Sequence, residues 1–274
     1  MFILTYVDDM IVTGTNETEI QSLIEQLKQH FSIKDLGDLH YFLGIEFKHT
    51  ISGMFLSQIK YIQDLLSKAG MQGAKSSTTP MVGNPPLSKF NGQPIADASL
   101  YRSIVGGFHY VTITRPEISY IVNKVSQFMQ FPLDTHWKAV KRILWYLVGN
   151  VHLGLHFIQS DSLIVTAFCD ADWGSDLDDR RSTSGFCVFM GKNLVSWSSK
   201  KQALVSRSST EAKYRSLAYT VCDLIWLLSL FKELHIPHMP SLDQAADIFT
   251  KPLSGQFFIR MRNKLHIIPD PTSN

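Results

Sequence analysis

The chain begins with two short apolar runs separated by two acidic residues. Residues 2–7 and 10–13 are rich in β-branched and aromatic side chains, and Asp8 and Asp9 stand between them. This pattern predicts a β-hairpin with the two aspartates near its turn. Since one hairpin does not make a stable sheet, we expect a domain whose earlier part is missing from this chain.

The apolar positions that follow alternate between helical and strand spacing as far as residue 72. Asn16 and Glu19 have the spacing of a helix N-cap and its third helical residue. The elements predicted in this part are a helix from Asn16 to Phe31, strands at 41–47 and 54–57, and a helix at 59–69. The segment 73–98 is rich in Ser, Thr, Pro and Gly, which is typical of a linker.

The second half of the chain combines helices with a further β-rich region. Helical periodicity predicts helices at about 118–129 and 134–147, and a long helix at 210–234. Strands are predicted at 163–169, 185–190 and 194–197. For the long helix we expect an inner face made of Leu217, Val221, Leu224, Leu228 and Phe231. The predicted fold class is therefore mixed, α+β or α/β.

Composition and charge narrow the class of protein. With 274 residues, of which 45% are hydrophobic and 18% charged, the chain can bury one core or two modest ones. The net charge of +2 excludes a histone-like polycation, but residues 101–215 hold 14 basic and 9 acidic side chains. We expect Arg181, Lys200, Lys201 and Arg207 from this part to contact a phosphate backbone.

Cysteines and apolar runs bear on the cellular compartment. Cys169, Cys187 and Cys222 are too few and too scattered for a disulfide framework, which favours a reducing compartment. The apolar stretch 219–231 contains Asp223 and is shorter than the roughly 18–20 residues that span a bilayer. The N-terminus has no secretory signal pattern. We expect a soluble intracellular protein, in the cytoplasm or nucleus, without a membrane partner.

Two groups of carboxylates are candidate Mg²⁺ ligands. Asp8 and Asp9 present hard oxygens at a hairpin tip, although aspartate also simply suits a turn. Asp170 ends a predicted apolar strand, where a carboxylate needs a partner, a metal ion or solvent. Glu211 opens the long helix and is a candidate for the same point, although Ser208 and Glu211 also have the spacing of a capping box.

An ordered series of segments resembles motifs of the copia-type LTR retrotransposon pol polyproteins. Tyr6-Val7-Asp8-Asp9-Met10 resembles the metal-binding motif of reverse transcriptases. The other segments that carry the resemblance are 36–46, 101–107, 114–118, 170–173, 181–185, 196–202, 208–212 and 246–253. The series covers essentially the whole chain, and an ordered series is far more specific than any one motif.

The resemblance implies a fold and an activity. Residues 1–72 would be the end of the reverse transcriptase palm and thumb, 73–98 a linker, 99–150 a helical connection, and 151–274 a truncated ribonuclease H-like α/β domain. The implied activity is RNA-directed DNA synthesis coupled to cleavage of the RNA strand of an RNA–DNA hybrid. Asp8 and Asp9 map onto the polymerase metal site, and Asp170, Glu211 and Asp247 onto the ribonuclease H metal ligands, with Mg²⁺ as the cofactor.

The chain also departs from the family pattern in two places. The earlier aspartate of the polymerase site has no counterpart before Asp8. After the long helix, residues 235–242 lead directly to 243–247, so the strand that carries the middle ribonuclease H aspartate is missing; Asp243 is a candidate substitute. We therefore expect a catalytically inactive fragment. The alternatives are a domesticated nucleic-acid-binding module, an internal piece of a longer active polyprotein, and an unrelated α+β protein.

Overall fold

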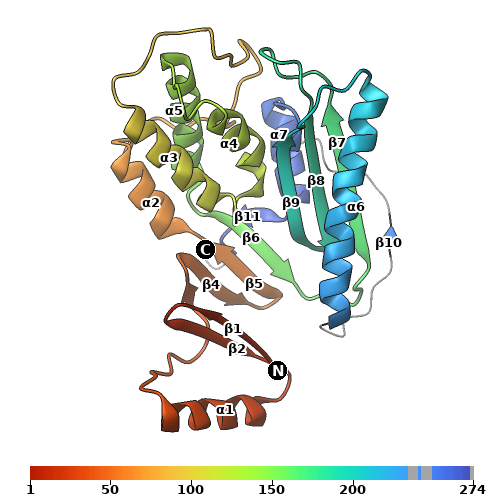
Figure 1. The fold of residues 1–274 in the computed structure, drawn as a ribbon. Helices are drawn as coiled ribbons and strands as arrows, with labels where there is room; N and C mark the ends of the chain where they lie inside the picture. The colour runs from red at the N-terminus through yellow and green to blue at the C-terminus, as the bar shows by residue number, and fades with distance from the viewer. Residues whose placement is uncertain (234–239, 242–248, 272–274) are drawn as a thin grey trace.

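A computed structural model describes residues 1–233, 240–241 and 249–271 of the chain (Figure 1). It is a mixed α/β structure with three sheets, in which the strand pairs are antiparallel apart from one short parallel pair. Figure 1 shows the N-terminal hairpin and first helix at one end of the molecule and the helices and the last sheet at the other. The mixed class predicted from the sequence is confirmed. No helix in the described part of the chain is long and apolar enough to cross a membrane.

The N-terminal hairpin forms as predicted. β1 (Phe2–Tyr6) and β2 (Asp9–Thr13) are antiparallel, with Tyr6 opposite Asp9. At the turn, Val7 has a φ of 49°, a left-handed conformation that is unusual for a β-branched residue. α1 (Glu17–His30) follows and is capped by Asn16, whose side chain accepts the N–H groups of the first turn. None of the α1 residues is buried, so this unit adds little to the core.

A second sheet joins distant parts of the chain in the order β11-β6-β5-β4-β3. Its strands are β3 (Tyr41–Phe42), β4 (Ile45–Thr50), β5 (Gly53–Ser57), β6 (Leu153–Ile158) and β11 (Ile267–Pro269). The single strand expected at 41–47 is wrong, because Leu43 and Gly44 have positive φ values of 49° and 78° and turn the chain between β3 and β4. β6 and β11 come from the C-terminal part of the chain, yet they extend the sheet that 41–57 begins.

The main core lies among the helices that stand between β5 and β6 in the chain. The helices are α2 (Ile59–Lys68), α3 (Ala98–Val111), the 3-10 turn η1 (Pro116–Ile118), α4 (Ser119–Ser126) and α5 (Asp134–Gly149). α2, α4 and α5 confirm the helices predicted at 59–69, 118–129 and 134–147, whereas helical periodicity predicted no helix at the position of α3. Ile104, Phe108 and Leu144 are fully buried here. The predicted linker, 73–98, has no helix or strand before Ala98, but it is fixed to the helices, since Thr79 and Ser88 are buried.

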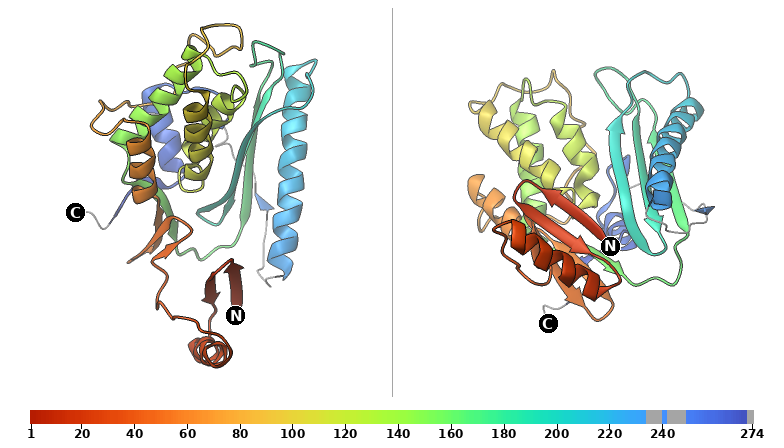
Figure 2. Two further views of the ribbon diagram at one scale, coloured as in Figure 1. Left: turned by 60° about the vertical axis from the view of Figure 1, so that its left-hand side comes forward. Right: turned by 60° about the horizontal axis from the view of Figure 1, so that its bottom comes forward.

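The third sheet has the order β10-β7-β8-β9. Its strands are β7 (Val165–Asp172), β8 (Thr183–Met190), β9 (Asn193–Lys201) and β10 (Pro240–Ser241), and the long helix is α6 (Ser209–Glu233). α6 covers one face, where Val165 and Val188 pack against Leu227 and Phe231 (Figure 2). On the other face Phe168 packs against the main core. α7 (Gly255–Lys264) closes that core with Phe258 and Met261.

The inner face of α6 differs in part from the expected one. Leu217 and Val221 are 41% and 42% exposed, whereas Ser216 and Thr220 are buried, as is Phe231. α6 and β7 approach each other closely at this point, where the Ser216 hydroxyl donates to the backbone carbonyl of Asp170 at 2.7 Å. Only small side chains fit between a helix and a strand at that separation.

Candidate functional site

The two aspartates of the N-terminal hairpin lie in open solvent. Asp8 is in the turn and Asp9 begins β2, and both are exposed. In the described part of the chain, neither carboxylate accepts a hydrogen bond or meets a cation. Burial raises the pKa of Tyr110 on α3, and the phenols of Tyr61, Tyr41 and Tyr6, the last at the end of β1, raise it further. Exposed carboxylates that no Lys or Arg of the described residues neutralises are chemically suited to Mg²⁺, so Asp8 and Asp9 stay predicted metal ligands.

Asp170 lies near the end of β7, on the sheet face opposite α6. It has the same strand parity as Phe168, which packs into the main core, and its Oδ2 accepts a hydrogen bond from the Thr250 hydroxyl at 2.8 Å. The Lys251 ammonium lies 3.8 Å from the same oxygen. Opposite Asp170 in the sheet is Gly185, where a Cβ would come within 2.6 Å of the Phe249 Cβ. A glycine here therefore lets residues 249–250 reach the aspartate.

Asp172 is a carboxylate that the sequence reasoning did not select. It stands two residues after Asp170 on β7, so alternation places both side chains on one face of the sheet. Burial raises the pKa of Asp172, Lys251 opposes that shift, and the negative charge of Asp170 adds to it. The Asp-Ala-Asp spacing at the end of an apolar strand is the signal that could have found it.

Glu211 acts as a capping residue of α6. Its Oε2 accepts the backbone N–H of Arg207 at 2.8 Å, and its Oε1 accepts from Arg215 Nη2 at 2.8 Å. The hydrogen bond from the Arg207 backbone lowers the pKa of Glu211 most, and the one from the Arg215 side chain lowers it further. The Ser208 hydroxyl accepts the Glu211 N–H, as a capping box requires, but the carboxylate reaches Arg207 rather than residue 208.

The described carboxylates near β7 do not fit a Mg²⁺ site as they stand. Asp170 faces Lys251 and Thr250, Glu211 is held by Arg215 on the helix that covers the other face, and the structure gives no contact between the two. Among residues 1–233, 240–241 and 249–271, no group of three His, Cys, Asp or Glu side chains is placed to hold a metal ion. Asp243 and Asp247 lie outside these residues, so their predicted roles stay predictions.

A buried ion cluster links the loop after β7 to the rest of the molecule. Asp176 is 3% exposed, and its Oδ2 lies 3.0 Å from Lys124 Nζ and 2.9 Å from Lys201 Nζ. Burial alone would raise the pKa of Asp176, but the two ammonium groups lower it well below its usual value. Lys201 also pairs with Asp179 at 2.8 Å. Its charge is therefore engaged within the protein.

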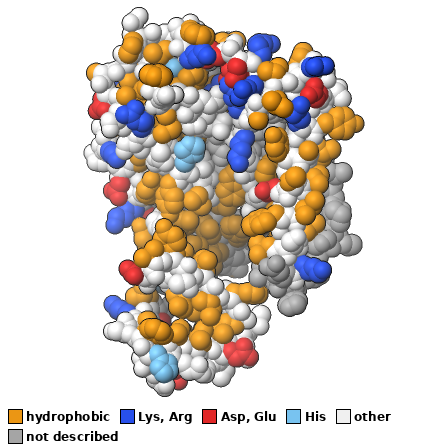
Figure 3. All heavy atoms as spheres, in the orientation of Figure 1, with side chains coloured by type: hydrophobic (Ala, Val, Ile, Leu, Met, Phe, Trp, Pro, Cys, Tyr) orange, Lys and Arg blue, Asp and Glu red, His pale blue; other side chains and the backbone are white. Residues whose placement is uncertain are grey.

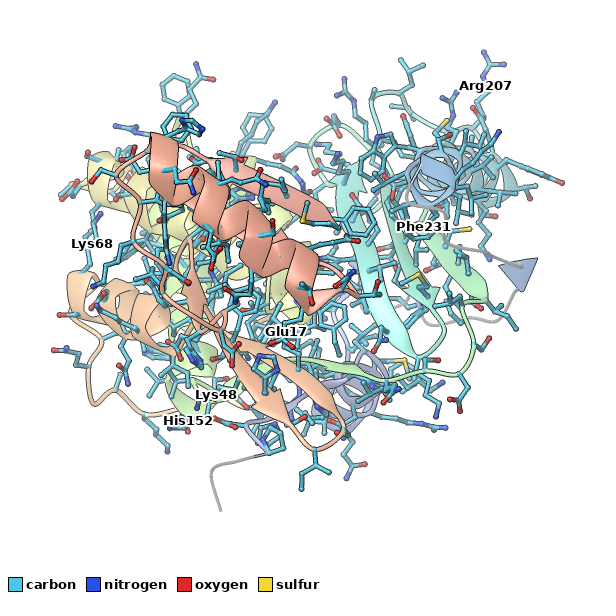
Figure 4. All side chains as sticks on the ribbon, turned by 90° about the horizontal axis from the view of Figure 1, so that it is seen from below. Glu17, Lys48, Lys68, His152, Arg207 and Phe231 are labelled. Atoms are coloured by element: carbon cyan, nitrogen blue, oxygen red, sulfur yellow. The ribbon has the colours of Figure 1, made fainter. Side chains whose placement is uncertain are left out.

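The other three predicted phosphate contacts present charge to solvent. Lys200 and Arg207 are exposed, and Arg181 is half-exposed beside Asp179 at 3.5 Å. These residues flank the start of β8, the end of β9 and the start of α6, so they gather at one end of the third sheet. Figure 3 shows Lys and Arg side chains at this upper end of the molecule, and Figure 4 shows Arg207 pointing outward.

A second buried ion pair was not predicted at all. Arg115 and Glu117 are both fully buried, with Arg115 Nε donating to Glu117 Oε1 at 2.7 Å. Arg115 also donates to the Asn150 carbonyl at 2.7 Å, and the Tyr146 hydroxyl donates to Glu117 at 3.1 Å. Arg262 of α7 reaches Tyr146 at 3.3 Å. The network joins η1, α5 and α7, which indicates a structural role.

Comparisons with known proteins identify relatives of most of the chain. Residues 1–83 match the model of a family described as reverse transcriptase (RNA-dependent DNA polymerase). The retrovirus-related Pol polyprotein from transposon RE1 of Arabidopsis thaliana is 48% identical over 236 residues, which are 86% of this chain and 16% of that protein. An uncharacterised mitochondrial protein of the same plant is 48% identical over 229 residues, 82% of this chain and 94% of that protein. No solved structure matches.

A third relative aligns over more positions than this chain has residues. The Pol polyprotein from transposon RE2 of Arabidopsis thaliana is 38% identical over 322 positions, which cover 100% of this chain but 22% of that protein. An alignment of 322 positions against 274 residues leaves at least 48 positions of the polyprotein without a counterpart here. The chain thus spans about a fifth of the length of the Pol polyproteins it matches and lacks part of the aligned region.

Proposed function

Because this chain belongs to the copia-type retrovirus-related Pol proteins of transposons, we propose that it is a reverse transcriptase–ribonuclease H fragment that binds nucleic acid without catalysis. In this proposal, residues 1–72 derive from the palm and thumb and 99–150 from the connection. Residues 151–274 derive from a ribonuclease H-like domain. The bound ligand is the phosphate backbone of an RNA–DNA hybrid.

One observation carries the proposal: the carboxylates and the exposed cations at the third sheet have different surroundings. Asp170 and Glu211 meet cationic side chains of the chain itself, Lys251 and Arg215. Lys200 and Arg207, at the same end of the sheet, are exposed. A Mg²⁺ site needs several free carboxylate oxygens, whereas a phosphate backbone needs only exposed positive charge. The surroundings therefore favour binding over hydrolysis.

The first test is cleavage of a labelled RNA–DNA hybrid by the purified chain in Mg²⁺, beside the variant Asp170→Asn. We expect no cleavage by either protein. Cleavage that disappears in Asp170→Asn would show that a catalytic site assembles and would contradict the proposal.

The second test measures hybrid binding as a function of salt. Each phosphate contact contributes about −0.9 to the slope of log K against log salt on duplex DNA, so Lys200→Gln with Arg207→Gln should flatten the slope by up to about two units. Asp170→Asn should bind as well as the wild type. Lys60→Gln is the matched control, since Lys60 is exposed on α2, away from this surface. Absent or salt-insensitive binding would overturn the proposal.

A second candidate is an internal piece of a longer active polyprotein. It is favoured by the small share of the RE1 and RE2 polyproteins, 16% and 22%, that the chain covers. The genomic sequence upstream decides this point. An open frame that encodes the missing polymerase aspartate supports the longer polyprotein, and a stop codon in that frame rejects it.

A further inference from the structure

The outer side of α6 is apolar along most of its length. This helix packs on the sheet through one side, where Leu227 and Phe231 are buried. In Figure 4, which looks along α6, Phe231 lies on the side of the sheet. The large apolar side chains on the opposite side and their exposed fractions are Tyr214 68%, Leu217 41%, Tyr219 51%, Val221 42%, Ile225 60% and Trp226 62%. Ala218 and Cys222 between them are also exposed.

The charged residues of this stretch do not interrupt the apolar surface. Arg215 is held by Glu211 at 2.8 Å, and Asp223 accepts a hydrogen bond from the Ser196 hydroxyl at 2.7 Å on the sheet side. From Tyr214 to Ser229, every exposed residue other than Ser229 is apolar. A helix that is apolar on two sides is expected to be buried on both. Figure 2 shows α6 at the edge of the molecule, with the sheet on one side and no other described element on its outer side.

The exposed residues are arranged around a line of small side chains. Ala218 and Cys222 are four positions apart, so they lie above one another along the middle of the surface. At helical spacing, Leu217 and Val221 flank this line on one side, and Tyr219 and Trp226 flank it on the other. Small residues at the centre allow two helix axes to approach, and the larger residues on either side then fill the space around the crossing.

The area of this surface is large enough for a subunit contact. Aromatic side chains offer about 150–250 Å² each, so Tyr214, Tyr219 and Trp226 expose roughly 350 Å² together. The exposed parts of the smaller Leu217, Val221 and Ile225 bring the apolar surface to roughly 500–600 Å² per copy. A standard interface buries about 800 Å² per partner. A monomer rarely exposes an apolar patch larger than a few hundred Å².

We propose that the chain forms a homodimer in which α6 packs antiparallel against α6 of a second copy, with the two-fold axis beside Cys222. A two-fold contact uses the same surface on both copies, and this surface is self-complementary because its small residues are central and its aromatic residues lie toward both ends. Leu217 and Ala218 then face the Ile225–Trp226 turn of the partner subunit. The inference does not depend on nucleic-acid binding, because Lys200 and Arg207 are not among the residues of this apolar surface.

The native cysteine at the axis gives the most specific test. In the dimer the two Cys222 thiols lie close together, so diamide should join them in a disulfide, taking up their two hydrogen atoms on its azo bond. Cys187 is buried and Cys169 half-buried, which makes them internal controls. We expect a disulfide-linked dimer of the wild type on a non-reducing gel and none from Cys222→Ser. Linkage through Cys169 or Cys187 would overturn the proposed geometry.

Light scattering after size-exclusion chromatography measures the mass of the dimer without a covalent cross-link. We expect about twice the chain mass of 31.1 kDa for the wild type and for Cys222→Ser at tens of micromolar. Ile225→Lys places a charge in the contact and should weaken the dimer by about tenfold or more. Ile51→Lys, in the fully exposed turn between β4 and β5, is the matched control and should stay dimeric. A monomeric wild type, or a dimer that Ile225→Lys leaves intact, would overturn the proposal.

Discussion

Replacing Asp176 with Asn tests how much the buried ion cluster stabilises the fold. The substitution keeps the shape of the side chain but removes the charge that faces Lys124 and Lys201 at 3.0 and 2.9 Å. The Lys124 side chain is 6% exposed, so its ammonium would stay buried after losing its ion pair with Asp176, and breaking a buried pair typically costs about 3–5 kcal/mol. Lys201 is 21% exposed and keeps Asp179, so it adds about 1 kcal/mol or less. We expect a loss of about 3 kcal/mol in the free energy of unfolding.

Urea unfolding of the Asp176→Asn and wild-type proteins is the assay. Because the folded-state pKa of Asp176 lies below its unfolded value, its contribution is fully present above the unfolded pKa and is lost as the pH falls through the folded one. The difference should therefore be constant near neutral pH. Asp161→Asn, at an exposed position, should change stability by less than about 0.5 kcal/mol. A difference below about 1 kcal/mol for Asp176→Asn would refute the reasoning.

Three further changes test burial and close packing. Burial lowers the pKa of His136, whose Nδ1 accepts a backbone N–H, so the protein should lose stability as the pH falls from the ordinary histidine value of about 6.5 through the lowered pKa of the folded state. Urea midpoints for His136→Gln should depend less on pH. Gly185→Ala should destabilise by about 1–3 kcal/mol because its Cβ meets Phe249, whereas Gly106→Ala, in open space on α3, should be neutral or stabilising. Tyr101→Phe removes a buried 2.7 Å hydrogen bond to a carbonyl of α4 and should cost about 1 kcal/mol by thermal unfolding.

The sequence was sufficient for the elements whose signal is local. The cap at Asn16, the hairpin around Asp8 and the period of α6 depend on neighbours within a few positions, and each is present in the structure. Pairing between distant strands has no such local signal. β6 and β11 extend the sheet of β5, and no pattern in residues 153–158 or 267–269 indicates which strand they pair with. The inner face of α6 was partly wrong for the same reason, because close approach to β7 selects Ser216 over Leu217.

At the candidate site, the sequence did not show which charged side chains are exposed and which are paired within the protein. In the sequence Lys200 and Lys201 are equivalent neighbours, yet successive residues of a strand point to opposite faces, so Lys200 is exposed while Lys201 pairs with Asp176 and Asp179. A count of basic residues therefore overestimates the charge that can meet a phosphate backbone. The same argument applies to acidic residues, since Glu211 is neutralised by Arg215 four positions later on its own helix. For this chain, affinity for nucleic acid should follow the exposed cations, and their number is smaller than the composition suggests.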